Sequence, residues 1–270
     1  MVDYSILQAV YRSDNPEYLS QSIDSMLAQT HSSNDYVIVE DGLVSDELES
    51  VIAGFKQRYS FITVIRLPFN VGLGLALNAG LSQCKNELIA RMDSDDISLP
   101  DRCAKQVACF EEDPELDIVG CPVVEFQDSA DNIVGKRTVP LDNETIHVFV
   151  RRRDPFNHPT VMYRKSKLLQ YGPYGDYRKN QDTDLWIKLL SNGCKGKNLD
   201  EPLLLFRFDQ ETLRKRRSWA NTRNLIAIRW DAMRKGFCSF WDFCVVAVTQ
   251  LLVFVMPPAF QKGIYKFIRH

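Results

Sequence analysis

The sequence predicts an α/β protein built on a single, mostly parallel sheet that is flanked by helices. Short apolar runs rich in β-branched residues, such as residues 36–39, alternate with segments whose apolar residues recur at helical spacing, such as residues 19–27. This alternation is typical of doubly wound parallel sheets. The chain of 270 residues has 45% hydrophobic and 25% charged residues, the composition of an ordinary globular protein. We therefore expect a large core rather than a disordered or disulfide-dependent chain.

The first hundred residues contain the clearest elements. We expect helices near residues 19–30, 48–59 and 75–84, with a glycine-rich turn at residues 70–74. The predicted strands are residues 4–11, 36–39, 62–67 and 87–92. Acidic clusters follow two of them, Glu40-Asp41 and residues 93–96. Ligands of such sheets bind at the carboxyl ends of the strands, so both clusters are expected on one binding edge.

The second half of the chain is less regular. We expect a helix at residues 103–112, then two sheet-edge strands at residues 118–126 and 133–139 joined by a polar turn. A final helix is predicted through residues 184–190. These elements complete the predicted domain.

The tail differs in composition from the rest of the chain. A basic segment, residues 214–235, precedes the apolar and aromatic residues 237–256, which Asp242 and Gln250 interrupt. The uninterrupted apolar part is shorter than the ~20 residues of a spanning helix. A basic segment beside an apolar helix favours an interfacial anchor on an anionic leaflet. The alternative is an amphipathic helix packed on the domain or on a second subunit.

Charge and cysteine content exclude several classes. A formal net charge of −2 gives no whole-protein electrostatic case for nucleic-acid binding. The seven cysteines are scattered and form no CxxC pair, so we expect reduced, mostly buried thiols of a cytosolic protein. The first residues lack the basic and apolar regions of a signal peptide.

Three motifs carry candidate chemistry. Asp93 and Asp95 alternate at a strand end and point to one side, which favours a Mg²⁺ or Mn²⁺ site shared with substrate phosphates. Asp41 is placed to accept a hydrogen bond from a nucleobase or ribose. Asp182 or Asp184, at a helix start, is a candidate general base. The alternatives are a solvated turn for the first two motifs and ordinary helix capping for the third.

The glycine-rich turn argues against two nucleotide-binding classes. Residues 70–78 read NVGLGLALN, which matches neither the dinucleotide GxGxxG pattern nor a phosphate-binding loop ending in Gly-Lys-Ser/Thr. NAD-dependent and P-loop chemistry are therefore disfavoured.

Taken in order, the motifs resemble family 2 glycosyltransferases with the GT-A fold over roughly the first 210 residues. Within that family the chain looks most like bacterial enzymes that build O-antigen, capsule and exopolysaccharide repeat units, such as the amylovoran type. The matching segments are residues 9–11, 25–30, 39–42, 70–78, 90–96, 158–160 and 181–186. We accordingly expect a GT-A domain at residues 1–213, with a nucleotide-sugar half (1–100) and an acceptor half (101–213), and a membrane-associated helical tail at residues 214–270.

The resemblance implies an inverting, metal-dependent, single-displacement transferase that serves surface polysaccharide biosynthesis. It would move one hexose or N-acetylhexosamine from a UDP-sugar to a saccharide on undecaprenyl diphosphate, at the cytoplasmic face of the inner membrane. Mn²⁺ or Mg²⁺ would bind Asp95 and Asp93, and Asp182 would be the base. The residues implied at the nucleotide are Ala9, Tyr11, Asp41, Asn70, Gly72, Arg91 and Asp93, while His158 and Arg207 are candidates for acceptor, phosphate or metal contacts.

This chain departs from the family pattern at four positions. Gln181 stands where a Glu is common, Leu77 replaces a frequent basic residue, and Glu40 and Leu43 replace residues of the usual DDGS motif. The change at Gln181 removes an acidic neighbour that could orient Asp182 or adjust its basicity. The change at Leu77 puts one contact with the diphosphate or the nucleobase in question.

Two other functions remain open at this stage. A sugar-phosphate nucleotidyltransferase should carry a basic, glycine-rich loop after its first strand, and residues 12–16 contain no glycine. A non-catalytic, peripheral-membrane module that binds sugar nucleotides would tolerate loss of the candidate catalytic aspartates, all of which are present. The sequence does not identify the sugar.

Overall fold

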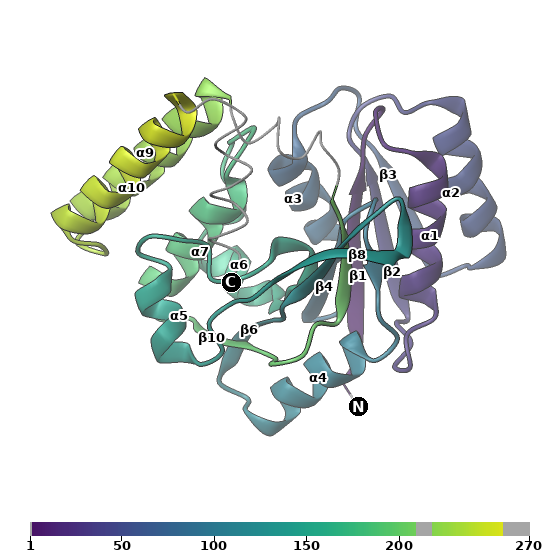
Figure 1. Cartoon of the computed structure of the whole chain (residues 1–270). Coiled ribbons are helices and arrows are strands. Elements are labelled where there is room, and N and C mark those ends of the chain that lie inside the picture. Colours follow the sequence, from purple (N-terminus) through teal and green to yellow (C-terminus); the bar gives the residue numbers. More distant parts are fainter. Residues whose placement is uncertain (1, 209–217, 256–270) are drawn as a thin grey trace.

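A central seven-stranded sheet with helices on both faces organises the protein (Figure 1). The computed structural model describes residues 2–208 and 218–255. The strand order is β10-β6-β9-β4-β1-β2-β3, and β9 is antiparallel to both of its neighbours while the other pairs are parallel. The strands are β1 (Tyr4–Val10), β2 (Asp35–Glu40), β3 (Ile62–Arg66), β4 (Leu88–Met92), β6 (Leu116–Gly120), β9 (Met162–Arg164) and β10 (Lys195–Asn198). The prediction of a mostly parallel sheet is confirmed.

Successive side chains of the strands pack into two hydrophobic cores, one on each face of the sheet. Leu7 and Val37 belong to the core that α3 and α7 cover, whereas Ile6 and Ile38 belong to the core under α1, α2 and α4. A Cβ on Gly80 of α3 would lie 2.4 Å from Leu7 Cδ1, so glycine lets this helix approach the sheet closely. The domain helices are α1 (Pro16–Leu27), α2 (Asp46–Arg58), α3 (Leu73–Gln83), α4 (Arg102–Glu112), α5 (Asn143–Phe149), α6 (Lys165–Tyr171) and α7 (Gln181–Ser191), with the 3₁₀ turn η1 (His158–Thr160).

The prediction of a single sheet is wrong, because a second sheet of four strands lies beside the first. Its order is β5-β11-β7-β8, comprising β5 (Ile97–Ser98), β11 (Leu204–Arg207), β7 (Val123–Gln127) and β8 (Ser129–Arg137). The continuous edge strand expected at residues 118–126 is instead two strands, β6 inside the main sheet and β7 in the second. Pro122 stands between them, and its missing N–H cannot continue a strand ladder.

The C-terminal part of the described chain is a pair of helices, α9 (Trp219–Arg234) and α10 (Phe240–Val255), which we call the C-terminal hairpin. The two helices pack on each other, and α9 contacts α7 (Figure 1). Within residues 2–208 and 218–255, no helix combines the length and apolar character needed to cross a membrane. The basic residues 214–217 and the prolines at 257 and 258 lie outside the described residues.

The cysteines agree with their predicted state. All seven are free, and all but Cys244 are buried. No disulfide therefore contributes to this fold.

Candidate active site

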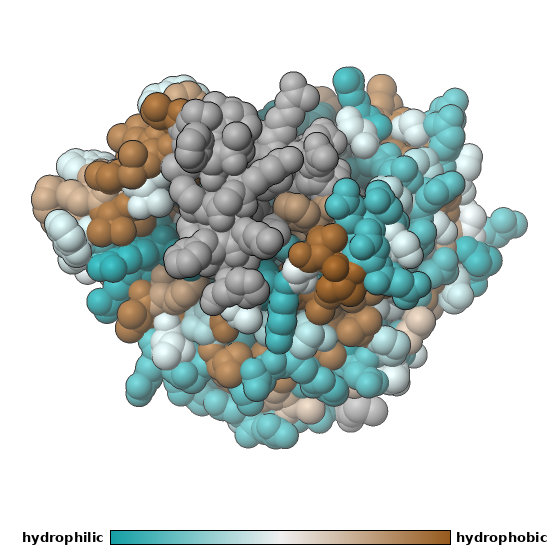
Figure 2. Space-filling view, viewed as in Figure 1, coloured by the Kyte–Doolittle hydropathy of each residue, from teal (hydrophilic) through white to brown (hydrophobic). Residues whose placement is uncertain are grey.

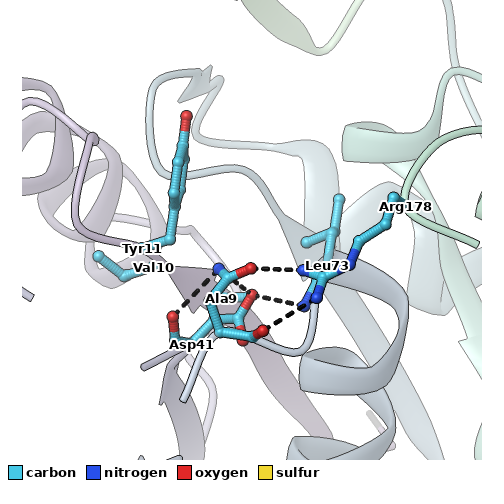
Figure 3. A pocket seen from close by; sticks show the side chains of 8 residues that line it. Ala9, Val10, Tyr11, Asp41, Leu73 and Arg178 are labelled. Carbon is cyan, nitrogen blue, oxygen red and sulfur yellow. Dashed lines mark hydrogen bonds between the residues drawn. The ribbon is translucent and has the colours of Figure 1, made fainter. Parts of the chain in front are cut away.

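A cavity of about 270 Å³ opens where β1 and β2 end and α3 begins (Figure 3). Its walls come from four separate stretches of chain. They are formed by Ala9, Val10, Tyr11, Asp41, Asn70, Gly72, Leu73 and Arg178. Five of the predicted nucleotide-binding residues (Ala9, Tyr11, Asp41, Asn70 and Gly72) are thus brought together at one edge of the sheet, as the parallel topology requires.

Asp41 shapes this cavity by holding the loop before α3. Its Oδ1 accepts a hydrogen bond from the Val71 N–H at 2.7 Å. Its Oδ2 accepts from the Gly72 N–H at 2.9 Å and from the Asn70 side chain at 2.8 Å. In Figure 3 the carboxylate points into these bonds, while the Tyr11 ring extends away from it. Asp41 therefore acts first as an anchor for residues 70–72.

Arg178 is a cavity residue that the sequence analysis missed. It comes from the loop between α6 and α7, and its guanidinium donates hydrogen bonds to the side chain and the carbonyl of Asn70. The φ of Gly72 is +95°, and a Cβ there would lie 3.1 Å from Arg178 Cδ. Glycine is thus required both for the backbone conformation and for the approach of the arginine.

Three carboxylates gather after β4, and we call Asp93, Asp95 and Asp96 the acidic cluster. One ligand atom from each lies within 4.8 Å of the others. Asp95 is on the exposed side of the cluster and Asp96 is buried. Carboxylate oxygens at this spacing are the donors that Mg²⁺ and Mn²⁺ use. Buried Asp96 Oδ2 has no hydrogen-bond partner among the described residues, which agrees with a place for a cation.

Crowding changes the acidity of the acidic cluster. Desolvation by the surrounding protein, with the negative charges of Asp93 and Asp14, raises the pKa of Asp95 to about 7. Burial and the charges of Asp95 and Asp93 raise the pKa of Asp96 well above its usual value. A bound cation would relieve this repulsion.

Two arginines hold the acidic cluster in place. Arg91 is buried in β4 and donates to the Asp93 carboxylate. Arg207, at the end of β11, donates from its backbone N–H to Asp96 Oδ1 at 2.9 Å and from Nε to the Asp95 carbonyl at 2.9 Å. Its guanidinium lies 3.6 Å from the ring centre of Tyr18. The geometry therefore gives Arg207 a supporting role at the cluster, and a contact of Arg91 with nucleotide stays a prediction.

Asp182 is the second residue of α7 and is half-buried. Its Oδ1 accepts a hydrogen bond from the Thr183 N–H at 3.0 Å. Burial and the nearby negative charge of Asp154 raise its pKa to about 7. Asp184, the second candidate base, instead pairs with Lys188 at 2.6 Å. Asp154 was not foreseen, since nothing in its local sequence distinguishes it.

His158 lies in a buried aromatic group. Its Nε2 is 2.8 Å from the Tyr174 hydroxyl, and its ring packs edge-on against Tyr174 and Trp186. Burial and the positive charge of Arg91 lower its pKa well below the usual value, so the imidazole is neutral. It is not part of the acidic cluster, and its predicted contact with acceptor or metal stays a prediction.

Tyr174 connects these parts of the site. Burial raises the pKa of its hydroxyl, and the charges of Arg91, Asp182 and Asp93 also act on it. Its backbone is fixed to α3, since the Asn78 side chain accepts from the Tyr174 N–H at 3.0 Å and donates to the Tyr174 carbonyl at 2.9 Å. The charges of the candidate base and of Asp93 in the acidic cluster therefore act on the same phenol.

The fold belongs to the GT-A-like class of α/β proteins. Two solved structures support this class, each with a TM-score of 0.66 over most of this chain. One is a mannosyltransferase of Pyrobaculum calidifontis in complex with GDP-Man and Mn²⁺, 14% identical, covering 94% of this chain and 72% of that one. The other is TarS of S. aureus in complex with UDP-GlcNAc, 16% identical, covering 93% and 72%.

The chain is a member of glycosyl transferase family 2, whose model matches residues 5–172. Two relatives cover most of its length. A UDP-Gal:α-D-GlcNAc-diphosphoundecaprenol β-1,3-galactosyltransferase of Escherichia coli is 34% identical over 97% of this chain and 95% of its own. An amylovoran biosynthesis glycosyltransferase of Erwinia amylovora is 37% identical over 80% of each chain. The predicted family is confirmed, and neither alternative function gains an observation in its favour.

Proposed function

We propose that this glycosyltransferase moves one hexose or N-acetylhexosamine from a UDP-sugar to a saccharide on undecaprenyl diphosphate, with inversion at the anomeric carbon. The observation that carries the proposal is the shared edge of the sheet. The cavity at Asp41 and the acidic cluster both follow strands at that edge, and Asp182 is close enough for its charge to act on the same Tyr174 hydroxyl as the charge of Asp93. The relative from Escherichia coli, matched along nearly its whole length, supports galactose as the first donor sugar to test.

The donor's nucleotide occupies the cavity. Base and ribose lie along Ala9, Tyr11 and the loop that Asp41 anchors. Arg178 stands on the opposite wall, where a guanidinium suits a diphosphate. Asp95 and Asp93 would hold Mn²⁺ or Mg²⁺, and the cation would neutralise charge on the diphosphate leaving group.

Asp182 removes the proton from the acceptor hydroxyl. That oxygen forms its bond to the anomeric carbon while the bond from this carbon to the UDP oxygen breaks, and UDP leaves with the electron pair. One displacement of this kind inverts the configuration. A carboxylate with a pKa near 7 is a stronger base than an ordinary aspartate and is about half ionised at pH 7.

The C-terminal hairpin brings the enzyme to its lipid-linked acceptor. Large apolar side chains stand exposed on it. Figure 2 shows hydrophobic residues among hydrophilic ones over the two helices at the upper left. The exposed apolar side chains are Trp219, Trp230, Phe240, Trp241, Val248, Leu251, Leu252 and Val255. Aromatic and aliphatic side chains of this kind insert into the interfacial region of a bilayer. We accordingly place residues 1–213 as the transferase domain and residues 214–270 as the part that binds the cytoplasmic face of the membrane.

A transfer assay tests this function. The full chain is incubated with Mn²⁺, a UDP-sugar and a synthetic lipid carrying GlcNAc on a diphosphate, and products are identified by mass spectrometry. We expect one added hexose with UDP-galactose and loss of transfer in Asp182→Asn, with UDP binding retained in calorimetry. Asp3→Asn, an exposed site far along the chain, is the matched control. Undiminished turnover in Asp182→Asn overturns the assignment of the base, and absence of transfer with every UDP-sugar overturns the reaction.

A further inference from the structure

The C-terminal hairpin contacts the loop that follows α5 through buried and charged side chains. Arg229 of α9 is buried, with a side chain only 2% exposed, and its Nη1 donates to the Val150 carbonyl. Its Nη2 lies 3.9 Å from Asp154 Oδ1. A second contact joins the same loop to α10, where Arg152 Nε donates to Asp242 Oδ1 at 2.5 Å. A buried arginine is costly without partners, so this contact is a built feature of the fold.

The same Asp154 oxygen faces the candidate base from the other side. Thr183 Oγ1 donates to Asp154 Oδ1 at 2.7 Å. The Thr183 N–H in turn donates to Asp182 Oδ1 at 3.0 Å. Thr183 is 1% exposed, whereas the Asp154 side chain is 39% exposed, so the connection is shielded from water at Thr183 and open to it at Asp154. An unbroken chain of contacts thus runs from α9 to Asp182.

We propose that Arg229 and Asp154 form a positioning pair through which the C-terminal hairpin sets the orientation and the charge state of Asp182. The proposal rests on the proposed function for the role of Asp182 as base. It makes the hairpin part of the catalytic environment, in addition to any contact it makes with lipid.

The charges of Asp154 and Arg229 have opposite effects on the pKa of Asp182. The charged or titratable groups that face Asp182 are Asp154 after α5, Arg91 on β4 and Tyr174 before α7, with Arg229 behind Asp154. After burial, the negative charge of Asp154 is the largest influence that raises the pKa of Asp182. Arg229 carries the opposite charge and offsets part of it. Loss of Arg229 leaves the charge of Asp154 without the countercharge of Arg229, while the hydrogen bond from Thr183 to Asp154 remains.

Variants that remove each charge of the pair test the proposal. The variants are Arg229→Met, Asp154→Asn and the double variant, with Arg229→Lys to restore charge and Arg223→Met, exposed on the same helix, as control. We expect Arg229→Met to move the acidic midpoint of the kcat profile upward by roughly half a pH unit, and Asp154→Asn to move it downward by about one. The acidic midpoint of the double variant should match that of Asp154→Asn, because the Asp154 carboxylate whose charge Arg229 offsets is absent from both. Arg229→Lys should lie near the unmodified enzyme.

A direct titration separates this proposal from the proposed function. Carbon-13 labelled aspartate allows the Asp182 carboxyl to be titrated by NMR, assigned from its loss in Asp182→Asn, without any turnover. Shifts of this titration in the directions given support the pair even if another residue proves to be the base. Unchanged Asp182 midpoints in folded Arg229→Met and Asp154→Asn overturn it. If Arg229→Met does not fold, Thr183→Val and Asp154→Asn decide the matter, since both leave the hairpin contacts with Val150 in place.

Discussion

Replacing Asp41 by asparagine should loosen the wall of the nucleotide cavity. The carboxylate accepts three hydrogen bonds from residues 70–72, one on Oδ1 and two on Oδ2. An asparagine can place its carbonyl oxygen at the Oδ2 position and keep the bonds from Gly72 and Asn70. Its NH₂ group then faces the Val71 N–H, so one bond is lost and two donors oppose each other.

The size of the effect follows from the lost bond and the opposed donors. A hydrogen bond to a charged group contributes about 1.5–3 kcal/mol, and an unsatisfied Val71 N–H adds about 1 kcal/mol. We therefore expect a loss of about 2–4 kcal/mol in the free energy of unfolding. Because the same loop lines the cavity, UDP should bind at least about tenfold more weakly, which corresponds to roughly 1.4 kcal/mol.

Urea unfolding and calorimetry with UDP measure the two quantities. Asp3→Asn serves as control, since its carboxylate is exposed and accepts a single bond from Asn34, and it should change stability by less than about 0.5 kcal/mol. A folded Asp41→Asn protein with the stability and UDP affinity of the unmodified chain would refute the view that Asp41 anchors the loop.

Further predictions address the metal, pH, packing and the membrane. Asp95→Asn should abolish the Mn²⁺-dependent rise in Tm with UDP, and an unchanged rise would contradict the metal assignment. Without metal, the free energy of unfolding should fall as pH rises from about 4 to about 7, because the folded state keeps protons on Asp95 and Asp182 that the unfolded chain has released; a flat urea-unfolding profile over that window would speak against the raised pKa values. Gly80→Ala should cost about 1–3 kcal/mol in urea unfolding, since its Cβ meets a leucine of β1 at 2.4 Å, and an unaltered midpoint would show that α3 can shift freely. Trp241→Glu combined with Leu252→Glu should reduce sedimentation with phosphatidylglycerol vesicles while leaving transfer to a soluble acceptor intact, and unchanged sedimentation would place lipid contacts elsewhere.

The first hundred residues were predictable because their signals are local. Buried parallel strands appear as short apolar runs, and the predicted strand at residues 62–67 ends within one residue of β3. The parallel arrangement of these strands then predicts Asp41 and Asp93 at one edge of the sheet. Those site residues follow from topology alone.

The second half was harder because its pairings are distant in sequence. β5 pairs with β11, more than a hundred residues away, and no local pattern indicates this. Arg178 and Asp154 were not predicted as site residues for the same reason, since each reaches the site only through a tertiary contact. Pro122 did offer a usable signal, because a proline inside a predicted strand argues that the strand ends there.

Under the proposed function, the stretch from Tyr174 to Asp182 would serve both halves of the reaction. Asn78 fixes its start to α3, Arg178 contacts the loop that lines the cavity, and Asp182, the proposed base, would face the acceptor. A displacement of this stretch would move both Arg178 at the cavity and the candidate base Asp182. Binding free energies are reciprocal, so if the nucleotide tightens acceptor binding through this stretch, the acceptor must tighten nucleotide binding by the same factor. The two substrates of this enzyme are therefore expected to be thermodynamically linked through nine residues of backbone.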